Sequence, residues 1–360
     1  MDFRYSTEQL DFRNSLRGLL CEAAPLSRAR EVSAADGYDE HLWRRLCSEM
    51  ELPGVHVSSE HGGAAGTLSD AAIAFEELGR ALAPVPLAGN VFVTEALLRM
   101  GDDEQRRRLL PGLLSGEQIA ALGTTGPGGA DTGVRAHDVG GRTVLSGECS
   151  PVLHGHVAHL YLIPAETDGA LRWYVVAAEA AGVCVVPLPS FDTTRPVARI
   201  TLRQVRAEAL ASSDGWERVL DVARVLLAAE SLGGAEACLG LSVDYARNRV
   251  QFGRPIGSFQ AVKHACAEMM IEIDATRVAV MFAAMSATDP EQLAITAPLV
   301  KAQAADTFAL CAGAAMQVHG GIAFTWEHDI HLYFRRAKTT QAMFGSSTYH
   351  RALLADRVGL

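Results

Sequence analysis

The sequence has few features that would place the protein in a membrane, outside the cell or on a nucleic acid. No run of 18 apolar residues interrupts it, although 49% of its 360 residues are hydrophobic, so no membrane-spanning helix is indicated. The first residues, MDFRYSTEQLDF, include charged side chains from the second position onward and contain no apolar export core. We therefore expect a cytoplasmic protein.

Cysteine pairs and basic stripes are also missing. The seven cysteines are scattered, and no two form a C-x-x-C pair, so the sequence favours free thiols over a disulfide framework or a zinc site. The net charge is −10, from 32 basic and 42 acidic residues, without a basic stripe. This balance argues against a nucleic-acid partner, and we predict no metal site.

The chain instead contains a helical region, a region of short strands and a second helical region. Helical periodicity marks 7–20, 39–50 and 69–83, and further helices are expected over 91–100 and 103–110. The Gly-rich stretch 56–66, HVSSEHGGAAG, lacks the Lys-Ser and strand–helix context of a phosphate loop, so we predict an ordinary loop. Residues 1–118 are therefore predicted to be an N-terminal helical domain.

Residues 119–213 have the composition of a small β domain. Segments rich in Val, Leu, Ile and Tyr are separated by turn residues every 8 to 12 positions, which favours a barrel or sandwich; they cover 142–146, 159–164, 172–177, 182–187 and 198–204. Long helical patterns return over 216–248, 259–286 and 291–318, with shorter ones near 325–337 and 348–356. We predict an α+β fold in which 214–360 form a C-terminal four-helix-bundle domain.

In two stretches of the last region, glycine or proline residues follow directly after a predicted helix end. In YARNRVQFGRPIGSFQ, residues 245–260, a helix end is followed by a Phe-Gly break and a Pro-Ile-Gly turn, so Arg249, Gln251 and Phe252 are expected side by side at the helix end. In MQVHGGIAFTWEHDIHLYFRRAK, residues 316–338, a pair of glycines at another helix end lets the backbone approach a bulky ligand closely.

Both stretches, and the order of the three regions, resemble the acyl-CoA dehydrogenases. In that family the R-x-x-F-G and Q-x-x-G-G corners of a neighbouring subunit hold the flavin dinucleotide FAD. The resemblance implies that Arg249 reaches the FAD pyrophosphate and that Arg224 contacts the CoA portion of the substrate. The alternatives for these two are ordinary helix cations, and His319 taken alone is typical of a buried core histidine. The residues that the resemblance assigns to FAD are Arg249, Gln251, Phe252, Gln260, Gln317, Val318, His319, Gly320, Gly321, Thr125 and Ser346.

The β domain departs from the family pattern at two places. The family's T-E-P-G-x-G-S-D run corresponds to residues 125–131, TGPGGAD, in which Gly126 replaces the glutamate. The family's W-I-T element, which supplies an aromatic wall and a hydroxyl donor to flavin N5, corresponds to Pro151-Val152-Leu153. The resemblance therefore implies that flavin binds through the remaining contacts but lacks this donor and this wall.

The carboxylate needed for dehydrogenation is missing at both positions where the family supplies it. Removal of the substrate's α-proton requires a base within about 3 Å. The two family positions are occupied here by Phe344 and Ala223, so no catalytic residue is predicted. Glu230 lies on the same helix face as Ala223 but about 10 Å further along the axis, whereas Asp221 faces away.

The sequence therefore predicts an FAD-binding acyl-CoA dehydrogenase subunit that acts with a partner. It resembles the bacterial subset in which unlike subunits pair to oxidise steroid or branched-chain thioesters. The resemblance implies a tetramer with a paralogous subunit that supplies the base, an acyl-CoA substrate and an electron-transferring flavoprotein as acceptor. The alternatives are a self-sufficient homotetramer that uses a displaced base such as Glu230, a flavin-dependent monooxygenase on the same fold, and a structural subunit without flavin.

Overall fold

The computed structural model describes residues 4–123, 126, 128 and 132–360. The chain packs into two compact units, of which unit 1 comprises Met1–Arg30, Leu68–Ala83 and Arg224–Leu360, and unit 2 comprises Glu31–Thr67 and Pro84–Ala223. These units group segments by packing, whereas the ranges 1–118, 119–213 and 214–360 group them by type of secondary structure. Helices α2 (Leu26–Ala34) and α7 (Trp216–Asn248) continue from one unit into the other.

Two helices of unit 2, α3 and α6, begin at side-chain caps, whereas α5 begins after Pro86 without one. The Asp39 side chain accepts from the backbone N–H of Leu42 at the start of α3, and Asp102 and Gln105 form a reciprocal capping box at the start of α6. These helices and the short 3-10 turns of the unit are α3 (Glu40–Met50), η1 (Leu52–Gly54), η2 (Ser59–His61), α5 (Leu87–Met100) and α6 (Asp103–Leu114). Residues 56–66, predicted to be a loop, contain only η2.

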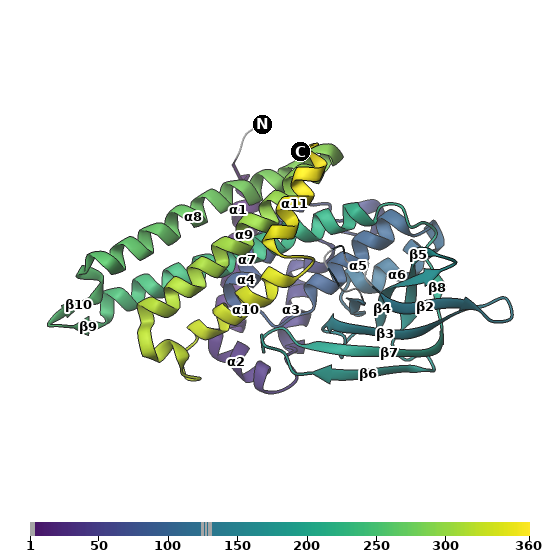
Figure 1. The fold of residues 1–360 in the computed structure, drawn as a ribbon, viewed down its shortest axis with the longest axis horizontal. Helices are drawn as coiled ribbons and strands as arrows, with labels where there is room; N and C mark the ends of the chain where they lie inside the picture. Colours follow the sequence, from purple (N-terminus) through teal and green to yellow (C-terminus); the bar gives the residue numbers. More distant parts are fainter. Residues whose placement is uncertain (1–3, 124–125, 127, 129–131) are drawn as a thin grey trace. The chain divides into compact units, whose positions relative to one another are not determined.

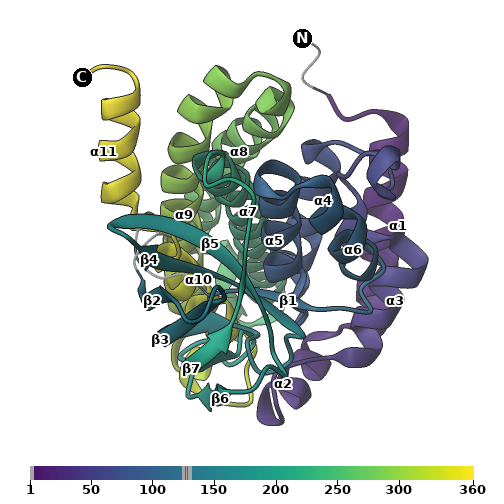
Figure 2. The ribbon, with the colours of Figure 1, turned by 90° about the vertical axis from the view of Figure 1, so that its right-hand side faces the viewer.

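The strands of unit 2 form one curled sheet with the order β6-β7-β3-β2-β4-β5-β8, and β1 pairs with β4 (Figure 2). After β7 the chain passes through a single residue, Ala207, into β8, which pairs with β5 at the opposite edge of the sheet. The sheet therefore curls toward closure, as the turn spacing of the sequence predicted. Its strands are β1 (Ala120–Leu122), β2 (Gly133–Asp138), β3 (Thr143–Leu153), β4 (Leu160–Thr167), β5 (Ala170–Ala177), β6 (Val183–Leu188), β7 (Val197–Arg206) and β8 (Glu208–Ala209).

Unit 1 is a helical bundle with a small hairpin at one end (Figure 1). The long helices predicted over 216–248, 259–286 and 291–318 are present to within one residue at each end. Besides α7, the elements are α1 (Thr7–Ala23), α4 (Leu68–Ala81), β9 (Val250–Gln251), β10 (Arg254–Pro255), η3 (Ile256–Ser258), α8 (Gln260–Met285), η4 (Ser286–Thr288), α9 (Pro290–His319), η5 (Gly320–Phe324), α10 (Ile330–Ala342) and α11 (Ser347–Arg357).

Helices α4 and α7 contact one another backbone to backbone. A Cβ atom on Gly233 would overlap the carbonyl oxygen of Glu76, and a Cβ atom on Gly79 would overlap the carbonyl oxygen of Glu230. Only glycine fits at these two positions, because any side chain would push the helices apart. The crossing therefore fixes how closely α4 lies against the centre of the bundle.

A network of ion pairs holds α1 and α8 to the same crossing. The carboxylates of Glu76 and Glu77 are each 1% exposed, and they pair with Arg13 and Arg17 of α1. Arg277 of α8 pairs with Glu236 of α7. Burial raises the pKa of Glu76, and the neighbouring arginines offset part of that effect.

Helix α7 and the segment Pro290–Phe324 are long and apolar enough to cross a membrane, with mean hydropathy 1.3 in each case. The apolar window of α7 is 72% buried inside the chain and that of the second segment 39%. Core helices of a soluble bundle have the same length and composition.

Candidate functional site

The end of α7 turns into a tight hairpin that the sequence did not predict. Strand β9 pairs with β10, and the two connecting residues, Phe252 and Gly253, both have positive φ, +54° and +76°. Two such residues in succession are typical of a type I′ turn, in which a phenylalanine is strained. The Phe252 side chain is 91% exposed. The hairpin therefore holds a bulky aromatic ring in solvent at the cost of a strained backbone.

The ends of α7 and α9 lie side by side, which brings the two predicted corners together. The ring of His319 stacks on Tyr245, with 4.4 Å between centroids, and its Nδ1 bonds to the carbonyl of Ala315. Burial lowers the pKa of His319, so the imidazole is neutral at pH 7. The His319 side chain is buried in the bundle, and its stacking on Tyr245 connects the end of α9 to the end of α7. Gly320, with φ +67°, then ends α9.

The residues around this join present donors for an anion. The N-terminus of α8 has no side-chain cap, because Phe259 occupies the N-cap position. Its free backbone N–H groups and the exposed guanidinium of Arg249 are the kind of donors that bind pyrophosphate. Gln251, Gln260 and Gln317 are exposed here, Val318 is half-buried and Gly321 leaves open space. The arrangement fits the phosphate and adenosine portions of a dinucleotide.

Apolar side chains surround the same end of unit 1. Large ones project into solvent from the hairpin and from η5 and the turn that follows it: Val250 (53% exposed), Ile322 (45%), Phe324 (78%) and Trp326 (64%). Apolar surface of this extent, rimmed by polar groups, marks an interaction site.

Arg224, the predicted substrate-binding residue, lies far from this corner and beside two residues that the sequence did not single out. Arg224 precedes the last residue of α7, Asn248, by 24 positions, which at 1.5 Å per residue is about 36 Å. Arg224, Lys301 and His350 are all fully buried, and Lys301 donates to the carbonyl of Thr340. Burial, followed by the charges of Lys301 and Arg224, lowers the pKa of His350 to about 3. This region is therefore a buried cationic environment.

Neither of the positions expected to hold a base carries a proton acceptor. Ala223 is buried in α7. Phe344 lies in the turn between α10 and α11 with φ +55°, and Ser346 caps α11 by accepting from the N–H of Tyr349. Glu230, the remaining candidate, accepts a 2.6 Å hydrogen bond from Arg336, and both side chains are buried. A carboxylate already engaged by a buried guanidinium is poorly placed to remove a proton from a substrate.

The matches in the β domain give less information. Thr125 lies outside the described residues. Pro151, Val152 and Leu153 form the end of β3, where Val152 and Leu153 pair with Ala198 and Val197 of β7. None of these three side chains has a hydrogen-bond donor, so none supplies one to a flavin.

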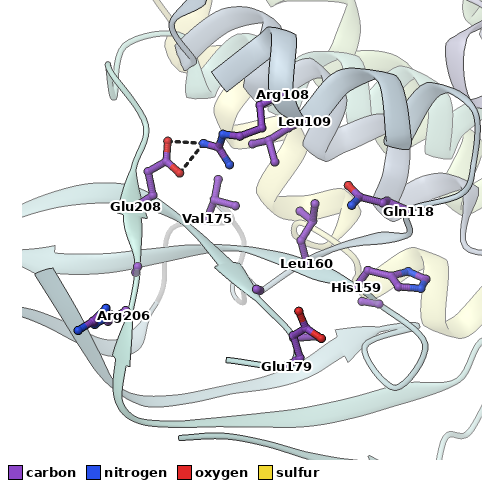
Figure 3. Close-up of a pocket in the computed structure, with 13 residues that line it drawn as sticks. Arg108, Leu109, Gln118, His159, Leu160, Val175, Glu179, Arg206 and Glu208 are labelled. Atoms are coloured by element: carbon purple, nitrogen blue, oxygen red, sulfur yellow. Dashed lines mark hydrogen bonds and ion pairs between the residues drawn. The ribbon is translucent and has the colours of Figure 1, made fainter. Parts of the chain in front are cut away.

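A cleft of about 640 Å³ in unit 2 is lined by none of the predicted residues (Figure 3). It lies between α6 and strands β4, β5 and β8, and Arg108 and Glu208 close one end of it with an ion pair of 2.6 Å. We assign it no part in the site.

Comparison with known proteins identifies the family of both helical terminal regions. The family described as "Acyl-CoA dehydrogenase, C-terminal domain" matches residues 214–359, and "Acyl-CoA dehydrogenase, N-terminal domain" matches residues 6–117. The acyl-CoA dehydrogenase IpdE2 of Mycobacterium tuberculosis is 39% identical over 332 residues, covering 92% of this chain and 91% of that protein. The protein of the same name from Mycolicibacterium smegmatis is 34% identical, covering 90% and 89%.

Solved structures match over almost the whole chain. The Tcur3481–Tcur3483 steroid ACAD G363A variant superposes with a TM-score of 0.89 at 31% identity, covering 98% of both chains. The ChsE4–ChsE5 complex from Mycobacterium tuberculosis gives a TM-score of 0.91 at 27% identity, covering 100% of this chain and 99% of the other. The predicted α+β fold, with helical terminal regions and a central β region, is confirmed. The chain belongs to the acyl-CoA dehydrogenase family of oxidoreductases.

Proposed function

We propose that this chain is the FAD-binding, base-lacking subunit of a heteromeric acyl-CoA dehydrogenase. The partner subunit supplies the carboxylate that removes the α-proton of a CoA thioester, and electron-transferring flavoprotein is the acceptor. The observation that carries the proposal is the separation of about 36 Å between Arg224 and the exposed corner at the other end of α7. The two groups serve different centres, so a cofactor held by the corner reacts in a neighbouring chain.

The residues of the corner have distinct tasks in this proposal. Arg249 and the uncapped N-terminus of α8 neutralise the pyrophosphate, and the backbone at Gly320 and Gly321 lets the cofactor lie close. Phe252, already held in solvent by its turn, packs against the cofactor or the partner. The flavin, when bound, supplies the hydride acceptor; the residues of this chain bind and orient it.

Exposed apolar side chains on the bundle support a partner subunit. Met270, Ile271 and Val278 of α8 are 56%, 67% and 59% exposed, and Leu299 and Leu310 of α9 are 42% and 45% exposed. Large apolar patches of this kind mark protein interfaces. The Tcur3481–Tcur3483 steroid ACAD and the ChsE4–ChsE5 complex each contain two differently named proteins, which supports an unlike partner. We propose a steroid or branched-chain acyl-CoA as the substrate class.

Co-expression with a paralogous acyl-CoA dehydrogenase subunit, sought among the genes that neighbour its own gene, tests the proposal. We expect the purified complex to be yellow, to contain both subunits and to oxidise an acyl-CoA, whereas this chain alone gives no turnover. Full dehydrogenase activity from the chain purified alone would contradict the proposal.

A matched pair of variants tests the corner. Arg249→Gln in the complex is expected to weaken FAD binding by about tenfold or more, because a charge-assisted contact to pyrophosphate is lost. Arg247→Gln, on the last turn of α7 two residues earlier and also exposed, is the control and should retain FAD. Flavin content after gel filtration measures both; equal retention by the two variants would show that Arg249 does not hold the cofactor.

A further inference from the structure

Three aromatic rings of unit 1 lie together between the two helix ends that form the proposed cofactor site. Tyr245 belongs to the last turn of α7, His319 is the last residue of α9, and His328 lies in the turn before α10. The rings of Tyr245 and His319 are stacked, and His328 meets His319 edge to face with 4.7 Å between centroids. His328 also meets Tyr245 edge to face at 6.4 Å. Each ring is therefore within contact range of the other two.

This three-ring cluster is directly continuous with the backbone of the residues proposed to bind FAD. The N–H of Arg249 donates to the carbonyl of Tyr245, and the carbonyl of Arg249 accepts from the N–H of Ile256 on the other side of the hairpin. On α9, the pair of glycines follows His319 without an intervening residue. The Tyr245–His319 stack therefore fixes the two halves of the corner relative to each other.

The turn that carries the third ring is held from two directions. Nδ1 of His328 accepts from the N–H of Ile330 at the start of α10, at 3.2 Å. Arg30 of α2 donates to the carbonyl of Glu327, at 2.9 Å, and forms an ion pair with Asp329. Arg30 precedes these residues by almost 300 positions. A distant helix thus holds His328 against the ends of α7 and α9.

The hydrogen bonds of the two imidazoles are those of neutral rings. His319 donates from Nδ1 to the carbonyl of Ala315, whereas His328 accepts at Nδ1 and therefore carries its proton on Nε2. Burial is the main cause that lowers the pKa of both residues. Two cations at this separation would repel each other, so the neutral forms allow the rings to pack.

We infer that Tyr245 and His328 are positioning residues for FAD, which act through His319 to hold Arg249 and the glycine pair in place. This inference rests on the proposed function, because it takes the corner as the place where FAD binds. The His319 side chain is 6% exposed, so it acts through the backbone on either side of it. The Tyr245 hydroxyl makes no hydrogen bond with a described residue, so its contribution comes from the ring.

Two substitutions of Tyr245 in the co-expressed complex test the role of the ring. Tyr245→Leu removes the stack, and we expect FAD to bind about fivefold or more weakly. Tyr245→Phe keeps the ring and loses only the hydroxyl, so its affinity for FAD should equal that of the wild type. Titration of the flavin-stripped complexes with FAD, followed by flavin fluorescence, gives both values of Kd. Equal affinity of the two variants would overturn the inference.

A substitution of His328 separates its ring from its hydrogen bond. The side chain of asparagine also accepts from the N–H two residues later, so His328→Asn keeps the contact with Ile330 and loses the ring. We expect this variant to bind FAD about threefold to tenfold more weakly. His41→Asn, at an exposed histidine of α3, is the control and should bind as the wild type does. Wild-type affinity in His328→Asn would remove His328 from the inference.

Hydrogen exchange of the flavin-stripped complex distinguishes this inference from the proposed function. The amides of 316–324 should exchange about tenfold faster in Tyr245→Leu than in Tyr245→Phe, because the stack holds the end of α9. Equal exchange in the two variants would overturn the inference even if the wild type binds FAD. Failure of the wild-type complex to bind FAD would overturn the proposed function, and with it the role of the cluster toward FAD, whatever the exchange shows.

Discussion

At the scale of single residues, the sequence and the structure differ most at Glu230. Because Glu230 lies on the same face of α7 as Ala223, the sequence allows it to be the displaced base of a self-sufficient enzyme. The structure pairs it with Arg336 of α10, which lies 106 positions later in the chain, and buries both. A helix face can be derived from the sequence, but the charge that a distant segment brings to that face cannot.

Glu230→Gln is therefore expected to affect stability and not turnover. Removing the Glu230 charge takes a close counter-charge away from the buried Arg336, and breaking a buried pair in this way typically costs about 3–5 kcal/mol. Urea denaturation measures this loss, and the double variant Glu230→Met with Arg336→Met should recover much of it. Turnover of the flavin-loaded complex should change little; a hundredfold loss in a folded, yellow complex would restore Glu230 as the base.

His350 gives the chain a stability that depends on pH. Its pKa is lowered to about 3 in the folded chain, by burial first and then by Lys301 and Arg224, whereas an unfolded histidine has a pKa of about 6.5. The unfolded chain therefore binds the extra proton, and stability is fully present above pH 6.5 and is lost as the pH falls toward 3.

From this group alone, the free energy of unfolding should fall by about 2 kcal/mol between pH 7 and pH 5. Burial also lowers the pKa of His156, His319, His328 and His331, so the whole chain loses stability in the same direction. The comparison that isolates His350 is His350→Gln, in which the fall measured by denaturant titration should be smaller by that amount. The same fall in both proteins would contradict the assignment.

At the scale of elements, the α4–α7 crossing depends on glycines whose role only their surroundings reveal. Gly233 and Gly240 both lie within α7, and in the sequence both simply weaken a helix. In the structure Gly233 touches the backbone of α4, whereas nothing lies within 4 Å of a Cβ atom on Gly240.

The two glycines should therefore respond to alanine in opposite directions. Gly240→Ala should stabilise the protein by about 0.5–1 kcal/mol, because alanine is the better helix former and space is open. Gly233→Ala forces a methyl group against the carbonyl of Glu76 and should cost about 3 kcal/mol or more. Thermal denaturation of the two variants measures both; a shift in the same direction would show that the crossing is loose.

The elements themselves were largely predictable from local pattern. The three long bundle helices and most strands of the curled sheet follow the expected ranges. The polar segment of α2 was missed, as was strand β2, whose sequence GVRAHD is rich in exposed residues. The hairpin after α7 was missed because its turn places Phe252 at positive φ, a backbone conformation that bulky side chains rarely adopt.

At the scale of the whole molecule, the arrangement of the site favours an assembly over a self-contained enzyme. The exposed corner, with Arg249 and Phe252, and the buried cationic region around Arg224 are at opposite parts of α7. A chain that used both for one reaction would need them close together. A second copy of the chain could bring the two together, but Ala223 and Phe344 supply no base in any copy, so we expect the purified chain to be inactive until an unlike partner is present.

The sequence by itself determined the periodic helices, the turn-separated strands, the family resemblance and the absence of carboxylates at positions 223 and 344. These follow from short-range patterns and from residue identity, which need no knowledge of distant contacts. Only the tertiary structure decided that Glu230 is engaged by Arg336, that β8 closes onto β5, and that His319 joins two helix ends. Each of these depends on segments far apart in the chain, and packing of the folded chain alone brings such segments together.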